Sequence, residues 1–308
     1  MAARKPQADS ESDFHIFDRD LLRQRRERAA AGFAAFDFLV RHVADGLADR
    51  LRDVNRRFPL ALDLGAHAGG LAERIRPLAD QVVRTDLSAG FLKRQPAPRL
   101  VADEELLPFT DGAFDLIASC LSLHWVNDLP GALVQARRAL KPDGLFLAAM
   151  LGGQTLRELR DSLAAAEAEL TSGLSPRVSP FADVRDVGDL LARAGFAMPV
   201  GDSEVLTVTY ENLFRLMRDL RGMGETNLLF KRRRQPPPRA LFPRAAQIYA
   251  ERFGLADGRI PATFEVVYLT GWAPSPDQPR PKRPGSATHR LADALGATEH
   301  RVKGTKGT

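Results

Sequence analysis

The chain has 308 residues, and 44% of them are hydrophobic, which suffices for a sizeable core in one large domain or two small ones. No apolar run approaches the roughly 18–20 residues of a membrane-spanning helix. The single cysteine, Cys120, excludes an internal disulfide framework, and the N-terminus lacks an apolar leader segment, so a cytoplasmic protein is predicted.

The net charge of +5 is concentrated towards one end of the chain. Residues 275–308 carry seven lysines and arginines against three acidic residues, in a sequence rich in proline, glycine and threonine. Such a composition is typical of a disordered, solvated tail. We therefore expect disordered tails at residues 1–13 and 274–308, and nucleic acid is not an expected partner.

Two amphipathic helices are predicted first, over residues 18–28 and 36–50, within an N-terminal helical cap at residues 14–56. Asp18 is the expected N-cap of the first helix. Short apolar strands then alternate with helices. The predicted strands cover residues 60–64, 81–86, 99–102, 114–121 and 145–150, and the helices between them cover residues 70–75 and 129–140. This alternation is typical of a parallel sheet covered by helices on both faces.

Helices over residues 155–170 and 184–194, with strands over residues 205–210 and 264–272, complete the pattern. The predicted fold is an α/β domain at residues 57–273 with a Rossmann-like, seven-stranded, mostly parallel sheet. Residues 211–260 form an insertion too long for a hairpin, so we expect it over the ligand edge of the sheet or projecting from it.

A turn at residues 61–70 carries the strongest indication of a ligand site. Asp63 ends a predicted strand, and Gly65 and Gly69 follow before a helix, where glycine lets the backbone approach a ligand closely. The acid stands before the glycines, unlike the order of a phosphate-binding loop, and it suits a cationic amine. S-adenosylmethionine carries such an amine in its methionine half. A glycine turn that serves only packing is the alternative.

Further acids follow the next two strands. Asp86 ends the second strand, where a carboxylate can accept from ribose hydroxyls, and Asp103 and Glu104 follow the third, where they can accept from an adenine amino group. Taken singly, each acid could serve a helix cap instead. Together they predict an S-adenosylmethionine site made of Asp63, Gly65, Ala66, His67, Gly69, Asp86, Leu87, Asp103, Glu104 and Ser119.

Several motifs in a fixed order resemble those of the type 11 class I methyltransferases. They are Asp63–Gly69, Asp86, Ala102–Phe109, Phe114–Asp115 and Leu140–Gly144. A closer resemblance, to the family of the mitochondrial complex I assembly factor 5 and its bacterial relatives, rests on segments spread over the chain. These are Ile16–Asp20, Phe58–Asp63, Ser122–Pro130, Gly152–Gly153, Ser179–Phe181, Asp219–Glu225 and Pro261–Thr263.

The closer resemblance implies a methyltransferase-fold protein that hydroxylates an arginine of a complex I subunit during assembly, so a protein substrate is expected. The malonyl-acyl-carrier-protein O-methyltransferases of biotin synthesis are the next resemblance and imply an acyl carrier protein as partner. A non-catalytic scaffold is the third hypothesis, because His67 stands where the family has a glycine. A side chain there could crowd the cofactor or, alternatively, hydrogen-bond its carboxylate.

His124 and Trp125 are the predicted catalytic residues, because they follow the fourth strand beside the methyl end of the crevice. His124 is expected to act as a base or an orienting group, and Trp125 to wall the pocket. The alternative is that Trp125 packs in the core and His124 bonds a loop. Asn127 and Asp128 are expected to cap the next helix. The histidine spacing does not fit a two-histidine-one-carboxylate site, so no metal is predicted.

Acidic side chains are expected to meet the guanidinium of a protein substrate, namely Asp18, Asp20, Glu104 and Glu105. Residues 221–225 have the glycine content of a mobile lid, with a turn between helices as the alternative. The basic run at residues 231–234 is expected in a solvated loop.

Overall fold

The computed structural model describes residues 15–171, 173–278, 286, 289 and 291–298. The expected tail at residues 1–13 lies outside this description. The chain forms two compact units, Met1–Pro274 and Ser275–Thr308. In the second unit, where a disordered tail is expected, α10 (Leu291–Leu295) is a short helix. All elements described below belong to the first unit.

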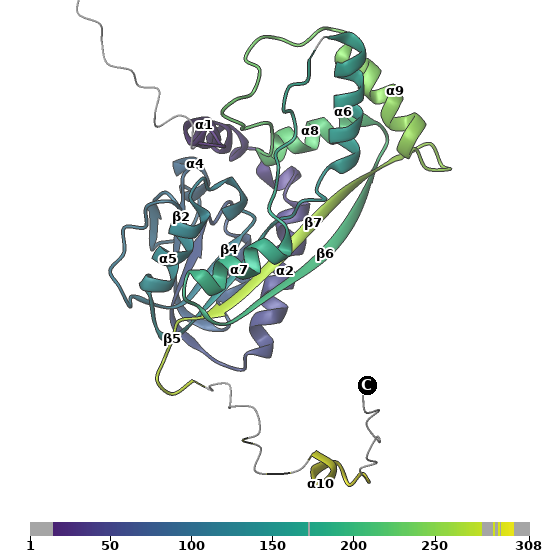
Figure 1. Ribbon diagram of the computed structural model, residues 1–308. Helices are drawn as coiled ribbons and strands as arrows, with labels where there is room; N and C mark the ends of the chain where they lie inside the picture. The colour runs from purple at the N-terminus through teal and green to yellow at the C-terminus, as the bar shows by residue number, and fades with distance from the viewer. Residues whose placement is uncertain (1–14, 172, 279–285, 287–288, 290, 299–308) are drawn as a thin grey trace, which may run out of the picture. The chain divides into compact units, whose positions relative to one another are not determined.

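One sheet organises the first unit (Figure 1). Its strands are β1 (Phe58–Leu64), β2 (Ala79–Asp86), β3 (Arg99–Val101), β4 (Phe114–Cys120), β5 (Leu140–Leu151), β6 (Ala197–Tyr210) and β7 (Ile260–Trp272). They follow the order β3-β2-β1-β4-β5-β7-β6. The pairs from β3 to β5 are parallel, whereas β7 is antiparallel to both β5 and β6. The predicted seven-stranded, mostly parallel sheet is confirmed.

Helices cover both faces of the sheet, as the alternation predicts. These helices and the short turns between them are α2 (Phe38–Asp53), α3 (Gly70–Ile75), α4 (Ala89–Leu92), α5 (Leu129–Ala139), α7 (Val184–Arg193), η1 (Phe33–Ala35) and η2 (Leu123–Trp125). α2 and α3 pack on one face and α5 and α7 on the other. None of the helices in the described part of the chain is long and apolar enough to cross a membrane.

A group of three helices, separate from the N-terminal residues 14–56, forms a cap at one end of the sheet (Figure 1). It consists of α6 (Arg157–Leu170), α8 (Leu213–Met223) and α9 (Leu241–Phe253), and the last two belong to the insertion. Residues 221–225, for which a lid and a turn were the two expectations, finish α8. Gly224 has a φ of +83° and ends the helix, as glycine commonly does after a last turn.

The strand β6 is longer than the apolar alternation at residues 205–210 predicts. Its 14 residues form the edge of the sheet, and most of them are exposed. Pro199 is tolerated there because an edge strand has one side without hydrogen-bond partners. Sequence patterns predict a strand from the alternation of buried side chains. They therefore miss a strand that pairs through its backbone while most of its side chains are exposed.

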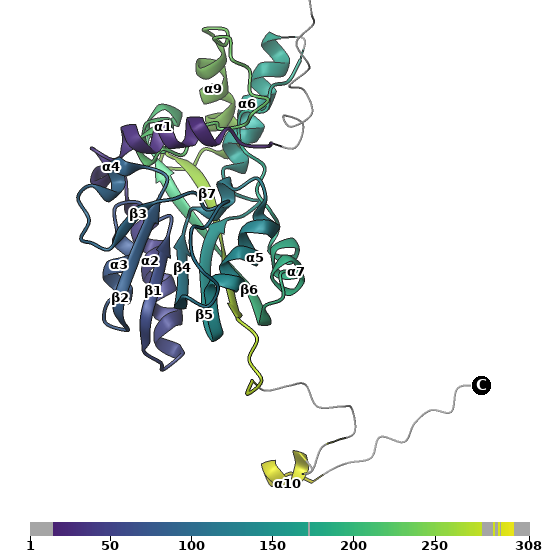
Figure 2. The same ribbon diagram turned by 90° about the vertical axis from the view of Figure 1, so that its left-hand side faces the viewer.

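The helix α1 (Arg19–Ala29) lies across the carboxyl ends of the parallel strands (Figure 2). It begins at Asp18, the predicted N-cap, whose side chain accepts a hydrogen bond from Leu21 N at 3.0 Å. Leu22 and the preceding Phe17 join a buried cluster that includes Trp125. This packing holds α1 over the edge where open parallel sheets bind ligands.

Candidate functional site

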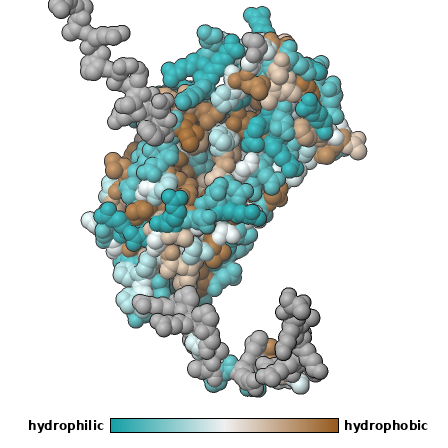
Figure 3. Space-filling model, viewed as in Figure 1, coloured by the Kyte–Doolittle hydropathy of each residue, from teal (hydrophilic) through white to brown (hydrophobic). Residues whose placement is uncertain are grey.

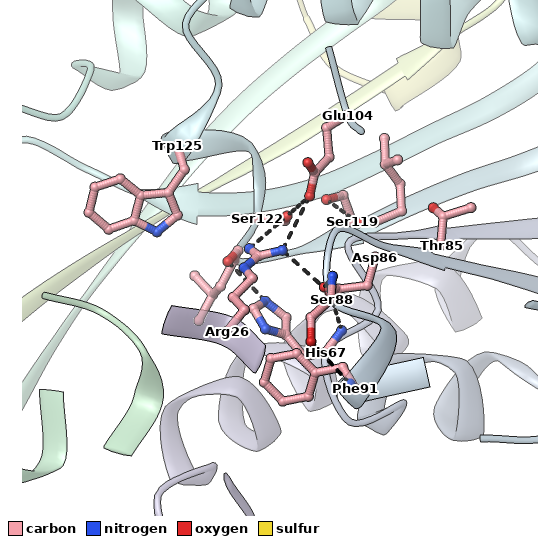
Figure 4. Close-up of polar contacts among 12 residues, drawn as sticks. Arg26, His67, Thr85, Asp86, Ser88, Phe91, Glu104, Ser119, Ser122 and Trp125 are labelled. Carbon is pink, nitrogen blue, oxygen red and sulfur yellow. Dashed lines mark hydrogen bonds and ion pairs between the residues drawn. The ribbon is translucent and has the colours of Figure 1, made fainter. Parts of the chain in front are cut away.

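Polar side chains from the ends of four neighbouring strands lie in a crevice beneath α1, and Figure 4 shows three of them, Asp86, Glu104 and Ser122. Asp63 and Asp86 end β1 and β2, while Glu104 and Ser122 follow β3 and β4. All four are fully buried. The strand-end acids therefore converge as the sequence predicts, because the carboxyl ends of parallel strands share one edge.

The carboxyl group of Asp63 lacks a full set of partners. Its Oδ2 accepts a hydrogen bond from Ala72 N at 3.1 Å, whereas the buried Oδ1 has no partner among the described residues. Burial raises the pKa of this carboxyl group to about 7, against the opposing effect of Arg84. A buried acceptor without a donor is costly, so Asp63 is suited to a ligand that brings one.

The turn after β1 passes close to Ser122. Gly65 has a φ of +73° and Gly69 a φ of +87°, in the left-handed region that favours glycine. A Cβ atom at Gly65 would lie 2.1 Å from Ser122 Oγ and 2.3 Å from Ser122 Cβ. The turn thus requires glycine for both its conformation and its close approach.

Replacing Gly65 by alanine should cost roughly 3 kcal/mol or more of unfolding free energy, from the positive φ and from overpacking against Ser122. Gly112→Ala is the matched control, because Gly112 has a φ of +68° and nothing within 4 Å of its Cβ position. The control should lose only about 1–2 kcal/mol. Urea unfolding of both variants measures the difference, and equal losses would mean that Ser122 moves aside freely.

Arg26 of α1 enters the crevice and bridges the strand-end acids (Figure 4). Its Nη1 lies 3.3 Å from Asp86 Oδ2 and 3.3 Å from Glu104 Oε1. Its Nη2 donates to Ser122 Oγ at 3.0 Å. The side chain is 2% exposed, which for arginine requires such pairing. Arg26 therefore stands where the sequence predicts cofactor hydroxyls.

A second guanidinium, that of Arg19, completes the charge cluster. It pairs with Asp103 and Glu104. Although burial raises the pKa of Glu104, Arg19 and Arg26 lower it to about 2. The sequence predicts that Asp103 and Glu104 accept from an adenine amino group. In the structure both bind arginines of the chain itself, because α1 docks over them.

His67 fills the tightest part of the turn, with a φ of +45°. Its backbone N donates to Asp86 Oδ2 at 3.0 Å, and its ring Nε2 lies 3.1 Å from Leu121 O. The ring stacks on Phe33 with centroids 5.8 Å apart and meets Phe91 edge-on. Burial, reinforced by a nearby guanidinium, lowers the pKa of His67, so the ring is neutral at pH 7. His67 thus occupies space in the crevice and closes its inner wall.

His124 and Trp125 converge on one carboxylate, that of Glu225. Trp125 Nε1 donates to Glu225 Oε2 at 2.8 Å, and His124 Nε2 lies 3.3 Å from the same oxygen. Both rings are buried and pack against Phe181. Burial raises the pKa of Glu225, but the hydrogen bond and the charge of His124, together with the charge of Arg26, outweigh it and hold this pKa below its usual range. The two predicted catalytic residues therefore share one partner, and their catalytic role stays a prediction.

The two polar residues before α5 have different roles. Asp128 caps the helix as predicted, and its side chain accepts from Gly131 N at 2.9 Å. For Asn127 the prediction of a cap is wrong. Its Oδ1 accepts from Phe17 N at 2.8 Å and its Nδ2 donates to Phe17 O at 3.2 Å, which ties the loop to the segment before α1.

The other predicted cofactor residues support the crevice from within. Ser119 Oγ donates to Leu64 O at 2.7 Å, and Ala66 N donates to Thr85 O at 2.7 Å. Leu87 packs in the buried cluster beneath α1. These contacts hold the three residues within the crevice, and their contact with a cofactor stays a prediction.

Sequence reasoning does not single out the arginines that pair with the acids. Arg26 follows Leu22 by one helical turn, and both are buried, so the apolar face of α1 was the available indication. Asp18, expected to meet a substrate, pairs with Arg232 at 3.0 Å. Several acidic residues that could bind a substrate guanidinium are thus already paired with arginines of the chain itself.

An apolar cavity of about 280 Å³ opens beside the crevice, next to the cap. Leucine, methionine and phenylalanine side chains form most of its wall. Figure 3 shows hydrophobic side chains at the surface between α1 and α6. Trp125 and Glu225 also line the cavity, and Glu225 is the one carboxylate among the described lining residues. A largely apolar cavity with few polar groups is typical of a ligand site.

Comparison with known proteins agrees with the fold. A methyltransferase domain model matches residues 62–148. A solved candidate methyltransferase from Bacillus halodurans superposes with a TM-score of 0.53 at 18% identity, over 74% of this chain and 99% of that one. The mitochondrial arginine hydroxylase NDUFAF5 of Danio rerio is 42% identical over 292 residues, which cover 92% of this chain and 91% of the relative. The chain belongs to the family of the arginine hydroxylase NDUFAF5.

This NDUFAF5-family chain also has relatives named for methyl transfer. The malonyl-[acyl-carrier protein] O-methyltransferase of Gallionella capsiferriformans is 34% identical, over 88% of this chain and 96% of the relative. The chain is thus an enzyme of the S-adenosylmethionine-dependent methyltransferase class, and S-adenosylmethionine is the cofactor of that class.

The crevice of this NDUFAF5-family member fits S-adenosylmethionine in its chemistry. Asp63 has an unpaired buried oxygen that suits the ammonium group, and Asp86 at the end of β2 suits ribose hydroxyls. Gly65 and Gly69 present backbone without side chains beside Asp63. Arg26 Nη1 lies 3.3 Å from Asp86 Oδ2, so the predicted contact of Asp86 with ribose hydroxyls would require the guanidinium to move aside.

Proposed function

We propose that this protein modifies an arginine side chain of a respiratory complex I subunit during assembly, in the cytoplasm, as an arginine hydroxylase-like enzyme. The cavity beside the crevice carries the proposal, because its apolar wall contains a single described carboxylate, Glu225. A side chain with an aliphatic stem and a cationic end suits such a cavity. Identity of 42% with the arginine hydroxylase NDUFAF5 over 92% of the chain supports the same choice.

The position of each residue suggests its role. S-adenosylmethionine, when bound, would supply an electrophilic methyl group on a positively charged sulfur, which serves methyl transfer. Hydroxylation of the arginine would take its oxygen atom from an oxidant such as dioxygen, with two electrons from an external reductant. Asp63, Asp86 and the turn with Gly65 would hold S-adenosylmethionine. Trp125 is part of the wall that excludes water from the cavity. His124 contacts Glu225, so in this proposal it orients that carboxylate and does not act directly as a base.

Mass spectrometry of complex I subunits tests the proposed function. In a strain that lacks the gene, we expect one arginine-containing peptide to be lighter by one oxygen atom than in the wild type. The gene supplied in trans should restore the mass. A difference of one methylene group would indicate methyl transfer to arginine instead. Identical arginine masses in both strains would contradict the proposal.

O-methylation of a malonyl thioester on an acyl carrier protein is the second candidate. Three arginines line the same cavity, Arg25, Arg177 and Arg221, and such side chains suit a substrate carboxylate. Growth of the deletion strain only with added biotin, together with unchanged complex I peptides, would support this candidate.

A non-catalytic assembly scaffold is the third candidate, favoured by the occupation of Asp86 by Arg26. It predicts that deletion lowers the amount of assembled complex I without changing any arginine mass. It also predicts no thermal shift with S-adenosylmethionine at millimolar concentration. A clear thermal shift would exclude it.

A further inference from the structure

We propose that Glu225 is the guanidinium receptor of the cavity and makes the site selective for arginine. The inference rests on the proposed function and names the residue that recognises its substrate. Glu225 directly follows Gly224, which ends α8, and its side chain lies at the wall of the cavity. Its position is therefore set by the end of a helix of the cap.

Among the described residues, side-chain partners reach one carboxylate oxygen of Glu225. Oε2 accepts from Trp125 Nε1 at 2.8 Å and lies 3.3 Å from His124 Nε2, whereas no described residue donates to Oε1. The Glu225 side chain remains 16% exposed, in the lining of the cavity. A carboxylate held on one side and open on the other can accept the N–H groups of a planar guanidinium.

The negative charge of Glu225 has one direct ion-pair partner among the described residues. Among the described residues, His124 is the one basic side chain within salt-bridge distance of it. Burial opposes ionisation, yet the pKa of Glu225 stays below its usual range, so the group is a carboxylate at pH 7. A partly buried carboxylate that is already desolvated gains strongly from a cation bonded to it.

Arginines beside the cavity restrict which cation can enter. Arg177 is neutralised by Glu167 at 2.6 Å. Arg25 donates to Asn227 O at 2.7 Å. Arg25 and Arg221 also line an adjoining groove, so these two arginines lie where the cavity meets that groove. These groups repel a free cation. A protein segment instead brings backbone carbonyl oxygens to them, so the assigned occupant is an arginine side chain within a protein.

Calorimetry with two capped amino acids tests the receptor on the full chain. The probes are acetyl-arginine amide and its citrulline counterpart, which has the same length but no charge. We expect the arginine compound to bind at least about tenfold more tightly, from charge-assisted hydrogen bonds to Glu225. Glu225→Gln should abolish this preference. Glu211→Gln should retain it, because Glu211 is an exposed carboxylate just before α8.

A second variant separates loss of the receptor from loss of folding. Met217→Trp fills the cavity from α8 and leaves Glu225 in place, so it should weaken both compounds while the thermal unfolding temperature changes little. The inference is overturned if wild-type protein binds both compounds equally or if Glu225→Gln keeps the preference. If the preference depends on Glu225 but the complex I arginine is unmodified, the receptor stands and the proposed function fails.

Discussion

Replacing Arg26 by alanine is expected to destabilise the protein by roughly 3 kcal/mol, because the change leaves buried carboxylates short of a counter-charge. Asp86 and Glu104 are both fully buried, and Arg26 Nη1 lies 3.3 Å from an oxygen of each. Glu104 keeps its pairing with Arg19, whereas Asp86 keeps only backbone donors among the described residues. Urea unfolding followed by tryptophan fluorescence measures the loss.

Arg28→Ala is the control, because Arg28 lies on the same helix but is exposed. Its loss should stay within about 0.5 kcal/mol. A loss for Arg26→Ala no larger than this would contradict the role of Arg26 as counter-charge. The Arg26 variant should also bind S-adenosylmethionine more tightly, since Asp86 is released. Weaker binding would instead make Arg26 a part of the cofactor site.

The affinity for S-adenosylmethionine is expected to rise between about pH 5 and pH 7, by up to about tenfold for each pH unit. Asp63 has a pKa of about 7 in the folded protein, against the ordinary value of 3.8 for aspartate, so its buried carboxyl group is mostly protonated in this range. An ammonium group binds the ionised form, so binding must release up to one proton. Calorimetry across this range, in two buffers of different ionisation enthalpy, measures both the affinity and the proton release.

The stability of the free protein should depend on Asp63 in the opposite direction. The folded state keeps a proton that the unfolded state loses near pH 4, so this group stabilises the fold most below about pH 4. That contribution is lost as the pH rises to about 7. Comparison with Asp63→Asn separates this effect from other carboxylates. If the variant kept the wild-type pH dependence of binding and of stability, the assignment of Asp63 would be wrong.

Local patterns are sufficient for the central elements of the fold. The helix α3 and the N-cap of α1 lie where the sequence predicts them. The central strand β4 is buried throughout, and its sequence is mostly apolar, with Asp115 and Ser119 as the polar residues. At the edge, β6 exposes most of its side chains, and its first half carries no such pattern.

The positions of His124 and Trp125 show what motif spacing can predict about a site. It places His124 and Trp125 beside the crevice, and the structure finds both there, in contact with Glu225. Spacing does not distinguish a residue that faces the cavity from one that supports it. Trp125 lines the cavity, whereas His124 is buried against Trp125 and Phe181 and reaches Glu225.

By itself, the sequence determined the class of fold and the crevice in which Asp63, Asp86 and Glu104 meet, since parallel strands bring their carboxyl ends to one edge. Only the tertiary structure decided what else enters that crevice. The docking of α1 brings Arg26 to Asp86 across 60 residues of sequence and to Glu104 across 78. Glu225 likewise meets His124 across 101 residues. Such contacts depend on how whole helices pack against the sheet, and neither periodicity nor motif spacing specifies that packing.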